Sequence, residues 1–521
     1  MSKASQWVNK VGGPQSNRQH EGFKPGYRFP FAERALVKRN AIRAMFDAQG
    51  ILDQKLISAN LPPVNKFSIG QPHLPPSFYD QSLKPMNAIA ARRGYSSEIG
   101  EREIRTDAAA YVVGHFPQLK EITDYSNIVI TAGASCGLTL AIKCLINTGD
   151  KILLFVPYFA AYGGHIDQNV DGATILKLPT HTTGYKPDSE ALRKMLGEHQ
   201  PKAIIFNNIC NPTGVALTAT EMSAFADVLR AFPDTWIISD LTYADLATDP
   251  NLGISYNDTT SLWEADTSGM PELLTVAPDL ARRTMCVFSN SKGLTGDPGA
   301  RCGFMWAPRF ATYVDGSDVV DPRTNEKCDI PKMLSTLQLH MITSVSKREQ
   351  ASLWRTLQAE LGLGSESENK QQALERSNRL KAYWDLSQIM SEEIPKAGFR
   401  QLSKPAGGFF TFIELSDLQG KVMPQSVRSF NGLVIEDLHA ELDKKIIETD
   451  VDACNFLLFV ANVSVVAGSG FGMDPLAMTA RVAFATETDK ALQFSEQVNY
   501  ARNLLLKVNI GVNHHECAMS Q

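Results

Sequence analysis

The chain has 521 residues, of which 43% are hydrophobic and 21% charged, an ordinary composition for a soluble globular protein. Its formal net charge of -5 at pH 7 is small for this length and gives no reason to expect nucleic acid as a partner. No apolar run approaches the ~18 residues that a membrane-spanning helix needs, so small-molecule chemistry is the default expectation.

The first three hundred residues predict an α/β unit. Residues 31–67 begin with helical periodicity and end in proline-rich breaks. From there to about residue 310, short apolar runs alternate with helical stretches, which predicts βαβ units and a mostly parallel sheet covered on both faces. The predicted strands span residues 127–131, 151–156, 203–207, 235–239 and 285–288.

The remainder predicts a smaller α+β unit. Residues 334–363 have the pattern of one long helix that links two domains, and a charged helix at residues 371–390 follows. Further strands are expected at residues 399–401, 409–415 and 457–466.

At ~100–200 residues per domain, the length allows more than one domain. We expect an N-terminal segment (residues 1–66) that packs with the small domain, a large domain (67–333) and a small C-terminal domain that includes the linking helix (334–521). Residues 249–278 and 420–445 look like insertions, about which the sequence says little.

The segment with the clearest chemistry runs from Cys286 to Arg301. The strand delivers Ser289, Ser291 and Lys292, and a glycine-rich turn then leads to Arg301. Hydroxyls and a guanidinium suit a dianionic phosphate, because arginine makes forked, charge-assisted hydrogen bonds. A lysine among them can form an imine with an aldehyde if its pKa is lowered. Taken alone, any one lysine is more often a solvated surface charge.

Two other strand ends offer further binding groups, at the edge where open α/β sheets bind ligands. Gly133, Ala134 and Ser135 open a helix after the first strand, and N–H groups at such a helix start bind phosphate. Phe159 follows the next strand and presents an aromatic face on which a ring can stack.

The next two strand ends carry polar groups suited to a pyridine ring. Asn211, in Asn-Pro-Thr-Gly, has an amide that can donate to a phenolic oxygen. Asp240 can pair with a pyridinium nitrogen, and Tyr243 can hydrogen-bond the same ring. Singly, each residue has an ordinary explanation as part of a turn, a core or a helix cap. Five strand ends with these groups in this order make chance agreement remote.

Together the motifs resemble the class I/II aminotransferases, which are fold-type I pyridoxal-phosphate enzymes, over about residues 67–486. The loop at Gly70 resembles the family's Gly-x-Pro segment, and Tyr95 with Gly100 resembles its Tyr…Gly segment. Arg481 matches the arginine that grips the substrate α-carboxylate, a task suited to a guanidinium. Small-domain signatures are matched at residues 405–410 and 468–472.

The resemblance implies pyridoxal 5′-phosphate as the cofactor, linked to the catalytic Lys292. It implies a seven-stranded, mostly parallel sheet between helices, plus a smaller α+β domain. It also implies that Tyr95 reaches the phosphate of a partner subunit in a homodimer with shared sites. Arg481 and Asn211 are expected to bind the substrate carboxylate, with Gly70 in the substrate pocket. The expected cofactor-binding residues are Tyr95, Gly133, Ala134, Ser135, Phe159, Asn211, Asp240, Tyr243, Ser289, Ser291, Lys292 and Arg301.

One spacing narrows the resemblance. Arg301 lies nine positions after Lys292, whereas many class I/II members leave eight. With Gly-Ser-Gly-Phe-Gly at residues 468–472, this spacing is similar to the alanine aminotransferase branch. Ala467 replaces the family's usual proline, however. We therefore expect transfer from an L-amino acid, with alanine preferred, to a 2-oxo acid such as 2-oxoglutarate by a ping-pong mechanism.

Several alternatives remain at this point. Lys347 lies in a second Ser-x-Ser-Lys, but inside a predicted helix and without a glycine loop. Ser135 also fits the Gly-x-Ser-x-Gly of α/β-hydrolases, with His340 or His439 as a possible base, although this leaves Lys292 unexplained. Other enzymes on the same cofactor scaffold are open: β-decarboxylases, C–S lyases and aminocyclopropane-carboxylate synthase-like lyases.

The eight cysteines include no Cys-x-x-Cys pair, which favours free thiols in a reducing compartment. The N-terminal residues lack an apolar signal core, so a cytoplasmic location is expected, although the late first acidic residue, Glu21, leaves a transit peptide open. No metal site is expected: the His-His-Glu-Cys run at residues 514–517 is better explained as a solvated tail.

Overall fold

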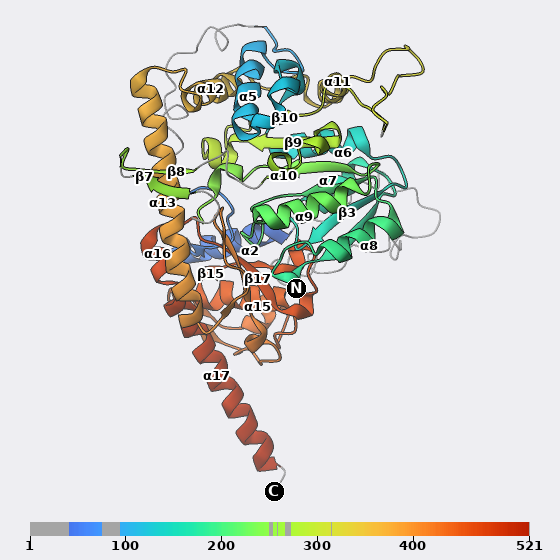
Figure 1. Cartoon of the computed structure of the whole chain (residues 1–521). Helices are drawn as coiled ribbons and strands as arrows, with labels where there is room; N and C mark the ends of the chain where they lie inside the picture. Colours follow the sequence, from blue (N-terminus) through green and yellow to red (C-terminus); the bar gives the residue numbers. More distant parts are fainter. Residues whose placement is uncertain are drawn as a thin grey trace.

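A seven-stranded sheet lies at the centre of the upper part of the molecule in Figure 1. The computed structural model describes residues 41–74, 94–249, 254–257, 259–265, 272–313 and 315–519, with backbone alone for Arg43, 254–255, 265 and 510–519. The strand order is β2-β10-β9-β6-β5-β3-β4. β10 pairs antiparallel with β2 and with β9, and the other four pairings are parallel. The prediction of a mostly parallel sheet is confirmed. The strands are β2 (Ile128–Thr131), β3 (Lys151–Val156), β4 (Thr174–Pro179), β5 (Ala203–Phe206), β6 (Trp236–Asp240), β9 (Thr284–Ser289) and β10 (Gly303–Trp306).

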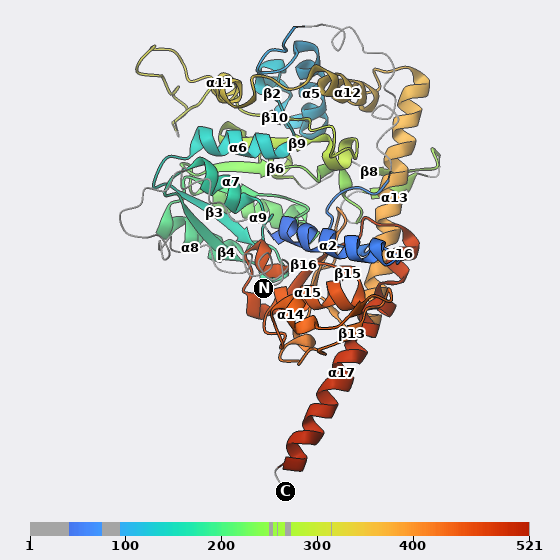
Figure 2. The same cartoon turned by 180° about the vertical axis from the view of Figure 1, so that it is seen from behind.

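Helices cover both faces because successive strand residues point to opposite sides and both sides are apolar. Val129 and Val287 join the core on one face, where α6 and α7 pack (Figure 2). Ile128 and Phe288 join the core on the other face, with α5, α8, α9 and α10 (Figure 1). These helices are α5 (Arg102–His115), α6 (Ala134–Leu145), α7 (Tyr162–Asn169), α8 (Ser189–His199), α9 (Ala219–Arg230) and α10 (Leu273–Val276).

A second, antiparallel sheet of four strands in the order β11-β12-β17-β16 forms the lower part of the molecule. Beside it, β1 (Asn65–Lys66), which follows α2 (Ala41–Ser58), pairs in parallel with β15 (Val463–Ser464). The domain boundaries expected from the sequence remain a prediction. The other elements here are β11 (Arg400–Gln401), β12 (Phe410–Glu414), β16 (Val466–Ala467), β17 (Thr479–Ala483), α14 (Leu438–Leu442), α15 (Asp450–Phe456), α16 (Thr488–Leu492) and α17 (Phe494–Met519).

The prediction of one helix over residues 334–363 was wrong. Two helices occupy this region, α11 (Ile330–Ile342) and α12 (Lys347–Glu360), because Thr343 adopts a positive φ of 64° that ends α11. The long helix is α13 (Glu366–Lys396), which extends beyond the predicted 371–390 at both ends and runs down to the second sheet (Figure 1). A capping box between Ser365 and Glu368 starts it.

The predicted last strand at residues 457–466 was also wrong in its first half. Residues Leu457–Ala461 continue α15 as a π-helix, and the short strands β15 and β16 follow. The central strand of this sheet is instead β17, between β12 and β16.

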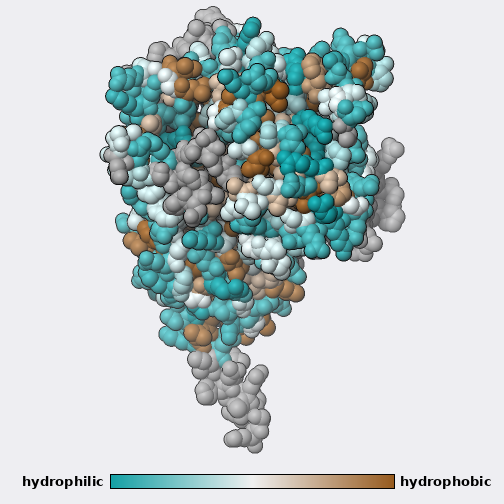
Figure 3. Space-filling model, in the orientation of Figure 1, coloured by the Kyte–Doolittle hydropathy of each residue, from teal (hydrophilic) through white to brown (hydrophobic). Residues whose placement is uncertain are grey.

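The two expected insertions contain short hairpins. β7 (Ile254–Asn257) and β8 (Leu262–Ala265) form one, in which the Trp263 amide donates to Ser377 of α13 at 2.7 Å. β13 (Val427–Arg428) and β14 (Val434–Ile435) form the other. Within the described ranges, no helix is both long and apolar enough to cross a membrane. On the face drawn in Figure 3, apolar side chains lie in small groups among hydrophilic ones.

Candidate active site

The carboxyl ends of the parallel strands open onto a cavity of about 630 Å³. The sequence predicted this edge, because parallel strands bring their carboxyl ends together. Helix α2 and the loop that follows β1 complete the wall, with Ile42, Phe46 and Ile69. The predicted site residues that line the cavity are Gly70, Ala134, Ser135, Phe159, Asn211, Asp240, Tyr243, Ser289, Ser291, Lys292, Arg301 and Arg481.

One end of the cavity is built for an anion. Gly133 turns β2 into α6 with a positive φ of 79°, a backbone conformation that favours glycine, and it lies beside the Arg301 guanidinium. Arg301 is exposed, and its guanidinium donates to the Ala132 carbonyl at 3.3 Å. Ser289 and Ser291 are joined by a 2.9 Å hydrogen bond between their hydroxyls. A helix start, hydroxyls and a guanidinium together fit a dianionic phosphate.

Lys292 lies in a one-turn π-helix (Asn290–Leu294) at the end of β9. Its Nζ donates to the Gly70 carbonyl and lies 5.8 Å from the centre of the Phe409 ring. Burial, reinforced by Arg481 and Arg301, lowers its pKa to about 7. An amine with such a pKa is about half uncharged at neutral pH, and the uncharged form can act as a nucleophile or a base.

Asp240 ends β6 and is 6% exposed. It accepts hydrogen bonds from Tyr162 Oη at 2.7 Å and Thr242 Oγ1 at 2.6 Å. Burial raises its pKa despite these bonds, so a cationic partner would stabilise the carboxylate. Neither donor was predicted from the sequence. The Asp-Leu-Thr spacing, typical of a side chain that binds backbone two residues on, could have indicated Thr242, whereas Tyr162 meets Asp240 only through the fold.

Arg481, on β17, is 1% exposed and stacks over the Phe410 and Phe471 rings at 4.6 and 5.0 Å. It donates to Asn211 Oδ1 at 3.0 Å and to the Ser68 carbonyl at 2.7 Å. Burial lowers its pKa to about 10. Among the described residues it has no carboxylate partner, so this buried cation is suited to an anionic ligand.

The amide of Asn211 also donates to Tyr243 Oη at 3.5 Å, which links the residue at the end of β5 to the one after β6. Both side chains are buried, with exposures of 4% and 6%. The structure therefore brings Arg481 and Asn211, the pair expected to bind a carboxylate, next to the groups expected around a pyridine ring.

The family model for aminotransferase class I and II matches residues 63–494. The chain belongs to this family. Class I/II aminotransferases depend on pyridoxal phosphate, and the chain is therefore a pyridoxal-phosphate-dependent transaminase.

Relatives in this family differ in the substrates that their names give. The aspartate aminotransferase of Rhizobium meliloti (strain 1021) is 23% identical over 375 residues, or 72% of this chain and 74% of the relative. The arginine–pyruvate transaminase of Pseudomonas aeruginosa is 26% identical over 162 residues, which is 31% of this chain and only 39% of that enzyme. A probable N-succinyldiaminopimelate aminotransferase of Mycobacterium tuberculosis is 25% identical over 259 residues, 48% of this chain and 62% of that relative.

Solved aminotransferases share the fold. The crystal structure of the Rhizobium meliloti aspartate aminotransferase matches with a TM-score of 0.68 and 19% identity over 91% of this chain and 99% of that chain. YbdL from Escherichia coli, with a methionine aminotransferase function, matches with a TM-score of 0.62 and 17% identity over 89% of this chain and 99% of that chain. The predicted fold-type I architecture is confirmed.

The cavity of this aminotransferase fits the cofactor on its own geometry. Gly133 leaves room for the Arg301 guanidinium beside the start of α6, and an amine of lowered pKa, a buried carboxylate and an anion-binding end all face the same cavity. These are the groups that a phosphorylated pyridine aldehyde requires.

Some predicted or alternative residues lie elsewhere. Tyr95 is 89% exposed and does not line the cavity of its own chain, so its expected task on a partner's phosphate remains a prediction. Lys347, the first residue of α12, is not a cavity residue either and lies 3.9 Å from Glu101.

The remaining alternatives gain nothing from the geometry. His340 and His439, the candidate bases of a hydrolase, do not line the cavity with Ser135. The side chains of residues 514–517 lie outside the described residues. Among the residues that are described, no group of three or more His, Cys, Asp or Glu could hold a metal ion.

Proposed function

We propose that the chain transfers the amino group of an L-α-amino acid, with alanine preferred, to a 2-oxo acid such as 2-oxoglutarate by a ping-pong mechanism. The observation that carries the proposal is the position of Arg481, a buried cation without a carboxylate partner among the described residues, in the same cavity as Lys292. A ligand carboxylate on Arg481 and Asn211 would hold an α-amino acid beside the lysine amine.

The rest of the lining supports a small apolar side chain on the donor. Ile42, Phe46, Ile69 and Leu138 line the cavity, and its described lining contains no lysine or arginine beyond Lys292 and the two arginines already discussed. A donor with a second carboxylate would therefore find no further fixed positive charge in this lining. The second carboxylate of 2-oxoglutarate would need solvent or a group outside it.

Three residues of the cavity would act on the substrate. Arg481 and Asn211 would hold the substrate carboxylate, and Lys292, with its lowered pKa, would take the proton from the substrate Cα and return a proton for the next step. The bound cofactor supplies an electron sink for the charge that develops at Cα.

Seven further side chains and the start of α6 would hold the cofactor. Asp240 would pair with its ring nitrogen, Tyr243 with its phenolic oxygen and Phe159 with a face of its ring. Arg301 would hold the phosphate together with Ser135, the neighbouring serines at the end of β9 and the first N–H groups of α6.

Absorbance spectra test the proposal. The purified protein is incubated with pyridoxal phosphate, and amino acids are then added one at a time, with Lys292→Ala as the control. We expect a visible band that the variant lacks, and conversion to the pyridoxamine form that is fastest with alanine. Absence of the band would refute cofactor attachment. A band that no amino acid converts would refute transamination, and faster conversion by aspartate would refute the alanine preference.

We also propose a cytoplasmic homodimer with shared sites. The 89% exposure of Tyr95 supports a role outside its own chain, and the cysteines of the described residues are free thiols. Mixing Tyr95→Phe and Lys292→Ala subunits should regenerate one intact site per mixed dimer and raise activity above that of either variant alone. No gain on mixing, with subunit exchange demonstrated, would contradict shared sites.

A further inference from the structure

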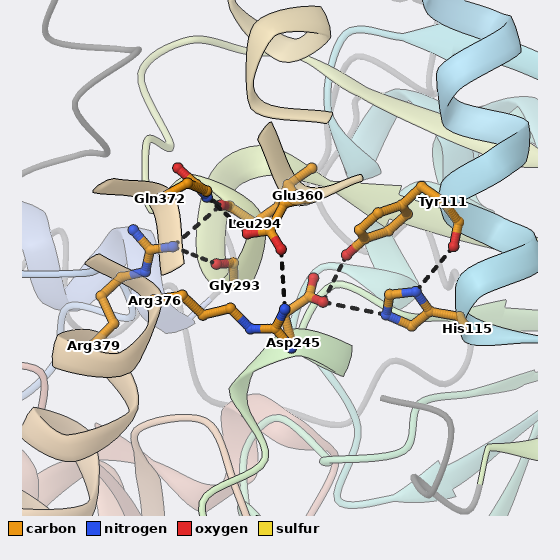
Figure 4. A network of polar contacts seen from close by, with 9 residues as sticks. All are labelled: Tyr111, His115, Asp245, Gly293, Leu294, Glu360, Gln372, Arg376 and Arg379. Carbon is orange, nitrogen blue, oxygen red and sulfur yellow. Dashed lines mark hydrogen bonds and ion pairs between the residues drawn. The ribbon is translucent and has the colours of Figure 1, made fainter. Parts of the chain in front are cut away.

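Immediately after Lys292, the backbone is held between two buried polar groups (Figure 4). On one side, Gly293 packs against Asp245, which follows β6. A Cβ added at Gly293 would lie 2.4 Å from the Asp245 Cβ and 3.0 Å from its Cα. The lysine turn is thus in direct contact with the segment that carries Asp240 and Tyr243, and it has no room to move towards that segment.

Asp245 is itself fixed from α5 and α13. It accepts a hydrogen bond from Tyr111 Oη at 2.6 Å and pairs with His115 Nε2 at 3.2 Å. Although burial raises its pKa, the bonds from His115, the charge of Arg376 and the bond from Tyr111 together lower the value to about 2. The Asp245 carboxylate is therefore charged at neutral pH, and its hydrogen bonds hold Asp245 in place against Gly293.

On the other side, Arg379 of α13 reaches the carbonyls at the end of the π-helix. Its Nη2 donates to the Gly293 and Leu294 oxygens, both at 3.2 Å, and its Nη1 lies 3.5 Å from the Thr295 oxygen. Carbonyls at the end of a helical turn lack intrahelical partners and carry partial negative charge, which a guanidinium complements. Gln372 adds a bond to the Leu294 oxygen at 3.4 Å.

The stability of helix α13 alone does not explain why the Arg379 side chain is buried against the lysine turn. Arg379 is 3% exposed, and burial lowers its pKa, which means that its charge is costly where it lies. Its neighbour Arg376 has an anionic partner, Glu360, at 3.0 Å, whereas the hydrogen bonds of Arg379 go to the carbonyls of the lysine turn.

We propose that Arg379 is a positioning residue that holds the turn of Lys292 against Asp245 and thereby fixes where the lysine Nζ lies in the cavity. The proposal rests on the proposed role of Lys292 as the cofactor's lysine. Lysine has a flexible four-carbon stem, so the position of its backbone determines which atoms Nζ can reach. A misplacement of ~1 Å can lower a reaction rate by ~10²-fold.

The test compares Arg379→Gln and Arg379→Lys with Arg355→Gln in the protein loaded with pyridoxal phosphate. Arg355 makes an ion pair with Glu368 in the first turn of α13, at 3.2 Å, so it controls for general loss of stability in this helix. Four quantities are measured: the thermal midpoint, the pH at which the visible band of the loaded protein changes without substrate, and the maximal rate and Kd of the half-reaction with an amino acid.

For Arg379→Gln we expect the maximal rate to fall by about 10- to 100-fold with Kd unchanged, and the pH of the spectral change to move. Arg379→Lys should restore part of the rate because it keeps one cationic donor. Arg355→Gln should lower the thermal midpoint alone. If Arg379→Gln does not fold, Gly293→Ala tests the same turn from the Asp245 side and should also shift the spectral change.

Arg379 variants that match Arg355→Gln in rate and spectrum, and differ from the wild type in thermal midpoint alone, would overturn the positioning role. That result would leave the proposed function intact, since the wild type would still show the visible band and its conversion. Absence of the band in the wild type would instead refute the function on which the positioning role depends.

Discussion

Replacement of Arg481 by methionine separates substrate binding from folding. Without a ligand, the guanidinium is 1% exposed and donates to neutral oxygens, those of Asn211 and Ser68. Methionine retains an unbranched apolar side chain against the Phe410 and Phe471 rings and removes the charge. Stability and catalysis should therefore respond very differently to this one change.

The magnitudes follow from burial and charge. Burial lowers the pKa of Arg481 to about 10, which corresponds to ~3 kcal/mol of destabilisation of the buried charged form. Removal of the charge relieves this cost and offsets the ~1–3 kcal/mol for each of the two acceptors that it leaves unsatisfied, so the free energy of unfolding should change by less than ~3 kcal/mol. Loss of the charged partner of the substrate carboxylate should cost ~2–5 kcal/mol of substrate binding. This cost corresponds to a decrease in kcat/KM of roughly 30- to 5000-fold.

Two assays check these values. Denaturant unfolding of the cofactor-free proteins measures stability, and kcat/KM is measured with the best amino donor. A thermal-shift series adds a 2-oxo acid or the matching ketone without the carboxylate; the acid should stabilise the wild type, and neither compound should stabilise the variant. A kcat/KM within about tenfold of the wild-type value, or an undiminished shift with the oxo acid, would refute the reasoning.

Three further changes probe the cofactor end of the cavity. The pKa of Lys292 is lowered to about 7, and the uncharged amine is the form that reacts. The rate at which the cofactor-free protein captures pyridoxal phosphate should therefore rise from about pH 6 to about pH 8 and stay constant above. A rate that continues to rise towards pH 10 would contradict the lowered pKa. Arg301→Gln should weaken pyridoxal phosphate binding by roughly 10- to 100-fold and leave the affinity for pyridoxal, which lacks the phosphate, unchanged in equilibrium titrations. Tyr162→Phe removes the 2.7 Å donor to Asp240 and should lower kcat/KM by about tenfold; an unchanged value would mean that Thr242 alone holds the carboxylate.

The sequence predicted many of the residues that line the cavity because they lie at strand ends. Asn211, Asp240 and Lys292 each follow an apolar run, and the carboxyl ends of neighbouring parallel strands necessarily converge. Local patterns were sufficient there. They also predicted the phosphate end, because the turn at Gly133 and the Ser-x-Ser-Lys segment are each continuous in the chain.

What the sequence missed depends on contacts between distant segments. Tyr162 reaches Asp240 from another element, and Arg379 meets the lysine turn from α13. The break at Thr343 was missed because apolar periodicity continues across it, and periodicity carries no information about one residue's φ.

The donor preference was inferred from the nine-position spacing between Lys292 and Arg301. In the structure, this spacing is set by the length of a loop. Ser289 and Gly303 pair on either side of it, so an added residue extends the loop and leaves the strands in register. The apolar wall that supports a small donor comes instead from α2, whose approach to the cavity no local pattern predicts.

Two contacts between early and late segments, the pairing of β1 with β15 and the bond of Arg481 to Ser68, affect how the chain folds during synthesis. Ser68 and Arg481, which share a hydrogen bond, are 413 residues apart, and synthesis at ~5–20 residues per second separates them by roughly 20–80 s. During that interval Leu52 and Leu56 of α2, fully buried in the finished protein, have no second sheet to pack against. The strands of the seven-stranded sheet and the lysine turn are therefore synthesised before β17, and Arg481 can bond to Ser68 only when β17 meets this much earlier segment.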